Sequence, residues 1–93
     1  MLKLTDKQWL GFSIYLGMKA AYRRSEMARY GVDYDDTVAA LAAQGVIRNG
    51  RIQPGAYDLF HERFPGQIAS QTHQVLVKLG LTLQPQEHII ATH

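Results

Sequence analysis

Apolar residues recur at helical spacing along most of the chain, in segments separated by glycine and proline. The first segment predicts a helix from Asp6 to about Tyr22. Thr5 and Gln8 precede and open it as a capping box, in which each side chain bonds a free backbone NH of the first turn. Two apolar faces, about 100° apart, both require burial. They consist of Trp9, Phe12, Leu16 and Ala20, and of Leu10, Ile14, Gly17 and Ala21.

The two faces of this helix can be covered in two ways. Either the rest of the domain covers both, or one face packs against a second copy of the chain or another partner, with Gly11 and Gly17 allowing close backbone approach. Tyr15, Met18 and Tyr22 lie on the remaining side, and aromatic residues with a polar tip are common at interfaces. The second alternative predicts a homodimer formed through this helix.

Two shorter helices are expected next. Ser25 can cap a helix that ends at Gly31, and Asp33 can cap a third helix that ends at Gly45. Asp35 and Asp36 fall in the first turn of the third helix, where the helix dipole favours negative charge. The inward face of that helix is predicted to contain Tyr34, Val38, Leu41 and Ala42.

Residues 46–53 carry the clearest local signal. Asn49-Gly50 separates two short apolar stretches, and both central residues of a type I′ turn need positive φ, which Asn and Gly adopt at low cost. A tight β-hairpin is therefore expected. Pro54-Gly55 ends it and precedes a helix with Tyr57, Phe60 and Phe64 on one face.

A last helix is predicted before Gly80, with an apolar stripe that consists of Ile68, Thr72, Val75, Leu76 and Leu79. The predicted fold class is thus mainly α, with about five helices and one short hairpin in a single domain over residues 1–80. Residues 81–93 form a tail, either loose or a short edge strand.

Composition narrows the class of protein. Ninety-three residues suffice for one core, and the absence of cysteine excludes disulfides and thiolate metal sites. The first residues lack a signal-peptide pattern, and no apolar run approaches the roughly 20 residues that cross a bilayer. We therefore expect a cytoplasmic protein without a membrane partner. The net charge is only +2, so any polyanion site must come from local clustering.

The order of three helices followed by a hairpin resembles the winged helix-turn-helix family over about residues 5–64. The strongest matching piece is residues 40–55, which look like the end of a recognition helix, its glycine cap and a short wing. The resemblance implies a winged-helix-like fold and DNA binding, with the third helix in the major groove and its outward side chains at base edges.

The outward positions of the predicted third helix are unusual for that role. They are Asp36, Ala39, Ala40 and Ala43, flanked by Asp35, Thr37 and Gln44. Methyl groups offer no hydrogen-bond donors, and carboxylates repel phosphates, whose contacts supply much of the affinity for DNA. We therefore expect a non-catalytic regulator or inhibitor that binds a protein partner. Its predicted contact residues are Tyr15, Met18, Tyr22, Asp35 and Asp36.

The alternative is a DNA-binding transcriptional regulator that contacts phosphates through its second helix and its wing. The residues predicted for this role are Arg23, Arg24, Arg29, Arg48 and Arg51. A plainer interpretation is that these arginines form a solvated face and pair with nearby acids, namely Glu26, Asp33, Asp35 and Asp36.

Catalytic and metal-binding patterns are weak. His61-Glu62 is followed by Pro65 where a zinc-binding helix needs a second histidine, and no serine has an adjacent base or a glycine-flanked turn. Asp35 and Asp36 point in different directions on a helix and cannot flank one substrate bond. We expect no catalytic, cofactor or metal site.

Overall fold

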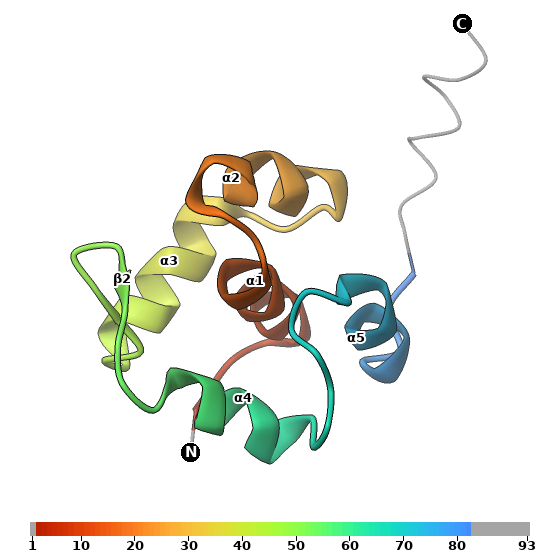
Figure 1. The fold of residues 1–93 in the computed structure, drawn as a ribbon. Coiled ribbons are helices and arrows are strands. Elements are labelled where there is room, and N and C mark those ends of the chain that lie inside the picture. The colour runs from red at the N-terminus through yellow and green to blue at the C-terminus, as the bar shows by residue number, and fades with distance from the viewer. Residues whose placement is uncertain (1, 83–93) are drawn as a thin grey trace, which may run out of the picture.

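The computed structural model describes residues 2–82. In this range the chain forms five helices and one two-stranded antiparallel hairpin, consistent with a winged-helix-like arrangement (Figure 1). The helices are α1 (Asp6–Gly17), α2 (Ala20–Arg29), α3 (Tyr34–Ala43), α4 (Ala56–Arg63) and α5 (Thr72–Lys78). The strands β1 (Ile47–Arg48) and β2 (Arg51–Ile52) lie between α3 and α4. The predicted mainly helical fold class is confirmed.

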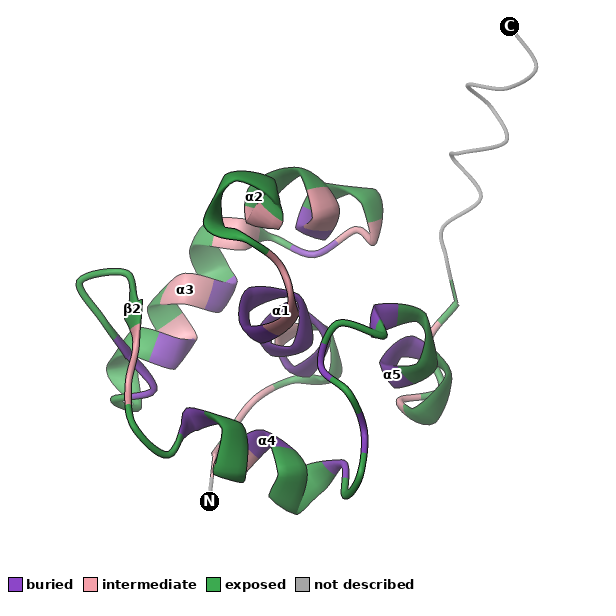
Figure 2. Cartoon of the chain, in the orientation of Figure 1, coloured by how far each residue is buried: buried purple, intermediate pink, exposed green. Residues whose placement is uncertain are grey.

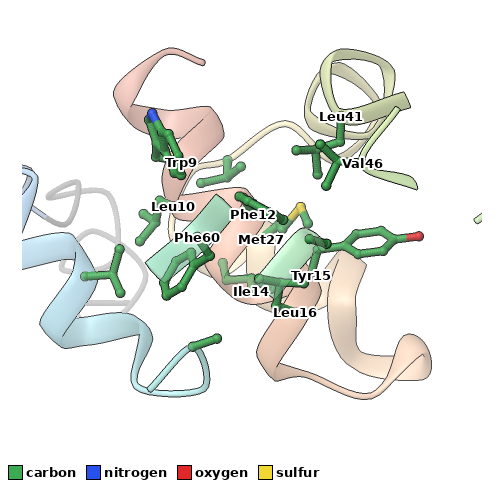
Figure 3. Close-up of a cluster of buried hydrophobic side chains, with 14 of the residues drawn as sticks. Trp9, Leu10, Phe12, Ile14, Tyr15, Leu16, Met27, Leu41, Val46 and Phe60 are labelled. Atoms are coloured by element: carbon green, nitrogen blue, oxygen red, sulfur yellow. The ribbon is translucent and has the colours of Figure 1, made fainter. Parts of the chain in front are cut away.

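Helix α1 is the centre of the fold. It contacts all four other helices, which surround it in Figure 1, and every residue from Trp9 to Leu16 is buried (Figure 2). Its apolar side chains meet Met27 of α2, Leu41 of α3 and Phe60 of α4 in one cluster (Figure 3). A helix that is apolar on all sides is stable only when it is covered on all sides. The rest of the chain provides that cover.

The predicted first helix was too long. The structure ends α1 at Gly17, and Met18 and Lys19 are extended before α2 begins at Ala20. The last carbonyls of α1 bond to side chains from other elements: Arg23 Nε donates to the Tyr15 oxygen at 3.0 Å. Tyr57 Oη donates to the Leu16 oxygen at 3.1 Å. These bonds satisfy groups that a continued helix would have used, so the break is stable.

The second helix also begins earlier than predicted. Ser25 lies inside α2, where its hydroxyl donates to the Tyr22 carbonyl, and it caps nothing. Lys19 occupies the cap position without a side-chain bond. The predicted N-caps of α1 and α3 are confirmed. Thr5 and Gln8 form the capping box, and the Asp33 side chain accepts a hydrogen bond from the backbone NH of Asp36.

Several predicted faces are shifted. In α3, Leu41 is buried and Tyr34 and Val38 pack against the core, as predicted, but Ala42 is exposed and Thr37 is buried in addition. Tyr57 of α4 is 47% exposed, and Ile68 precedes α5 and is 56% exposed. Gly80 follows α5 with φ of 75°, as expected for a helix end. Of the tail, residues 83–93 lie outside the described range, so both alternatives for it, a loose segment or a short edge strand, stay open.

Candidate nucleic-acid interface

Asn49 and Gly50 form the tip of the hairpin with φ values of 53° and 77°, the positive pair that a type I′ turn requires. This turn fixes the register, so that Arg48 lies directly opposite Arg51 and Ile47 opposite Ile52. Ile47 faces the core, whereas both arginines are exposed. Like charges placed opposite each other across a strand pair destabilise it. Within residues 2–82 neither arginine is paired with a carboxylate.

Tyr15 connects the hairpin tip to α2. Its hydroxyl donates to the carbonyl of Gly50 at 2.7 Å, and the Arg23 guanidinium lies 3.9 Å from the centre of its ring. Figure 3 shows the Tyr15 ring extending from α1 away from Phe60, with the hydroxyl at its far end. One side chain thus contacts the hairpin tip and holds an arginine against its face. Sequence periodicity gives no sign of this link.

Burial raises the pKa of the Tyr15 phenol above its ordinary value of 10.0, while the adjacent Arg23 charge opposes the rise and Tyr34 adds to it. The phenol therefore stays protonated at neutral pH. A protonated hydroxyl can donate to the Gly50 carbonyl, so the charge state of Tyr15 matches its role at the hairpin tip.

The other predicted arginines differ in their surroundings. Arg24 forms an exposed ion pair with Asp35 at 3.5 Å and lies over the Tyr34 ring. Arg29 pairs with Glu26 at 3.8 Å. The structure therefore contains the predicted pairing with nearby acids for Arg24 and Arg29. Exposed pairs of this kind contribute little to stability and leave hydrogen-bond donors free for other anions.

The predicted protein-contact residues do not form one surface. Tyr15 is 2% exposed, so it cannot anchor a partner, and that part of the prediction is wrong. Met18 is half-buried against the core, whereas Tyr22 is 57% exposed. Asp35 and Asp36 are exposed but already bonded: Asp35 pairs with Arg24, and Asp36 accepts from Gln8 Nε2 at 3.0 Å.

The predicted homodimer through the first helix stays a prediction, but the two glycines of α1 are not available for it. A Cβ added to Gly11 would lie 2.6 Å from the Thr37 methyl, and one added to Gly17 would lie 2.5 Å from the Ser70 backbone. The close approach that these glycines allow is therefore made within the chain. Because Trp9 to Leu16 are all buried, this part of α1 has no free face for a second copy.

The exposed face of α3 carries carboxylates and methyl groups. Its members are Asp35, Asp36, Ala39, Ala42 and Ala43. Thr37, predicted to flank that face, is buried beside Gly11 instead. This face offers no side-chain donor to a base edge, and its two acids lie at the helix end that enters a groove first in helix-turn-helix complexes.

Among residues 2–82 no group of three or more His, Cys, Asp and Glu side chains is arranged to hold a metal ion. Within the same range, no helix is both long and apolar enough to cross a membrane. Comparisons of the chain with protein-family models, curated proteins and solved structures give no match. The winged-helix resemblance therefore depends on the order and packing of the elements alone.

Proposed function

We propose that this protein is a non-catalytic, cytoplasmic regulator that binds double-stranded DNA through phosphate contacts from its hairpin and α2. The observation that carries the proposal is the Arg48–Arg51 cross-strand pair, exposed and without a carboxylate partner among the described residues. Two opposed guanidinium groups cost stability in the free protein. An anion bound between them removes that cost, and a phosphate accepts hydrogen bonds from both.

The position of Arg23 adds to this argument. The Tyr15 side chain places Arg23 and the hairpin tip on one side of the domain, so their charges reinforce each other. Lys19 and Arg24, exposed at the start of α2, add positive charge close to Arg23 in the sequence. A duplex presents rows of phosphates, and each neutralised phosphate releases counterions and increases affinity.

The same surface predicts the mode of binding. Because the exposed face of α3 lacks donors and carries Asp35 and Asp36, we expect this helix to stay outside the major groove. Binding through phosphates alone is tolerant of sequence. The hairpin arginines would then favour narrow minor grooves, which have a strongly negative potential.

The proposal is tested by duplex binding in a salt titration. Arg48→Ala combined with Arg51→Ala should weaken binding at least tenfold at low salt and should lower the slope of log affinity against log salt by about two. Arg63→Ala is the matched control, because Arg63 is an exposed arginine of α4 that lies over Trp9, away from the hairpin. Failure of the unchanged protein to retard any duplex at low salt would refute the proposal.

A protein partner remains the second candidate function, favoured by one observation. Tyr22 is 57% exposed on α2, close in sequence to the half-buried Met18, and a solvent-exposed tyrosine is a common anchor of interfaces. In this case a regulator or inhibitor would bind its partner through α2. Asp35 would supply complementary charge at the neighbouring end of α3.

The two candidates are separated by affinity capture from cells with tagged protein, with and without nuclease. A partner retained after nuclease treatment and lost with Tyr22→Ala would support the protein-binding function. Tyr57→Ala is the matched control, since Tyr57 is a comparably exposed tyrosine on α4. Retention of every partner by the Tyr22 variant would exclude Tyr22 as the anchor.

A further inference from the structure

The hairpin is too short to fix the direction of its own tip. Each strand contains two residues, and an isolated two-stranded hairpin is at best marginally stable in water. Ile47 and Val46 anchor its base in the core. The tip, which carries Arg48 and Arg51 on either side, needs a separate contact to hold it in one orientation.

Tyr15 supplies that contact. Its phenol is the nearest group to the position that a Cβ on Gly50 would occupy, at 4.0 Å, and its hydroxyl bonds the Gly50 carbonyl at 2.7 Å. Tyr15 itself lies on α1, the most buried element of the fold. The tip is therefore tied to the rigid centre of the domain by one hydrogen bond.

The same residue determines the position of Arg23 at its other end. Arg23 Nε donates to the Tyr15 carbonyl at 3.0 Å, and the guanidinium lies 3.9 Å from the ring centre. These two contacts hold a long, rotatable side chain in one conformation. Less entropy is then lost when the guanidinium binds a phosphate.

We infer that Tyr15 is a positioning residue for DNA binding, which sets the separation between the hairpin arginines and Arg23 without touching the nucleic acid. This inference rests on the proposed function. The Tyr15 ring is buried, so any effect of this residue on binding must act through the residues that it holds. Loss of the hydroxyl alone should release the hairpin tip while leaving the core packing of the ring in place.

The test compares Tyr15→Phe with Tyr57→Phe. Both substitutions remove one hydroxyl that donates to a backbone carbonyl, but the Tyr57 hydroxyl bonds Leu16 of α1, at 3.1 Å, and not the hairpin tip. Tyr15→Phe should weaken duplex binding on the order of fivefold, the equivalent of one hydrogen bond, and should lower the salt slope. Tyr57→Phe should change neither. In a background lacking Arg48 and Arg51, Tyr15→Phe should have no further effect on binding.

Amide exchange and NMR relaxation at Asn49 and Gly50 provide a readout that needs no DNA. Both should show a more mobile tip in Tyr15→Phe than in Tyr57→Phe. Unchanged affinity and salt slope in Tyr15→Phe would overturn the inference while leaving the proposed function intact. If the unchanged protein binds no duplex, the proposed function and the role of Tyr15 in binding both fail. An unchanged tip in Tyr15→Phe would also overturn the structural link.

Discussion

Gly11 of α1 lies against Thr37 of α3 so closely that a Cβ at position 11 would come within 2.6 Å of the threonine methyl and 2.7 Å of its hydroxyl oxygen. The Thr37 hydroxyl is buried and has no hydrogen-bond partner within residues 2–82. The two helices therefore approach through a glycine on one side and an unpaired threonine on the other. Volume at this contact determines how closely they pack.

Overpacking in Gly11→Ala should destabilise the fold by about 1–3 kcal/mol. The higher helix propensity of alanine should offset about 1 kcal/mol of this loss. Thr37→Ala removes both of the atoms that would be too close. The double variant should consequently be more stable than the sum of the single changes predicts, as measured by urea unfolding. Strict additivity of the two effects would show that the helices do not meet at these residues.

Stability should fall in alkaline solution because burial raises the pKa of Tyr15 above 10.0. Above that pH the unfolded chain releases the phenol proton while the folded protein retains it. The stabilising contribution is therefore complete below pH 10.0 and is lost as pH rises through the folded-state pKa. Urea unfolding between pH 8 and about pH 11 should show a steeper decline for the unchanged protein than for Tyr15→Phe. Parallel profiles would contradict this assignment.

Removal of the carboxylate of Asp35 should strengthen duplex binding under the proposed function. Asp35→Asn frees Arg24 from its 3.5 Å pair and removes a charge that repels phosphate. We expect affinity at low salt to rise roughly threefold to tenfold, with the difference shrinking as salt increases. Glu62→Gln, an exposed change of the same charge on α4, is the control. An equal gain in both variants would indicate only an effect of net charge.

The contribution of the Asp33 side chain as the N-cap of α3 should be separable from the effect of its charge. Asp33→Ala removes the acceptor of the Asp36 backbone NH and should cost about 1 kcal/mol of stability, measured by thermal or urea unfolding. Asp33→Ser retains a side-chain oxygen at the cap and should recover most of that loss. If alanine and serine are equally tolerated, the cap makes no contribution to the stability of the helix.

Local signals in the sequence predicted much of the fold. The Thr5–Gln8 capping box, the Asp33 cap and the Asn49-Gly50 turn each depend on residues a few positions apart, and each is found in the structure. The end of α1 could not be predicted in this way. It depends on Tyr57, 41 positions from Leu16, and on close packing of Gly17 against Ser70.

The candidate site was predicted only in part. The exposed arginines of the hairpin follow from the turn register, which the sequence determines. The burial of Tyr15 does not, because a tyrosine on an apolar helix suits a core and an interface equally well. Only the position of the hairpin tip, folded back against α1, distinguishes the two, and that position depends on contacts between distant parts of the chain.

The central location of α1 determines how short a fragment of this chain can still fold. Phe60, Val75 and Leu76, from the elements after the hairpin, complete the cluster around α1, and Ser13 donates to the Ala69 carbonyl at 2.7 Å. A truncated chain ending at Ile52 would lose that cover and leave the serine unsatisfied. The first three helices and the hairpin are therefore not expected to fold by themselves. Moving them into another protein would require α4 and α5 as well.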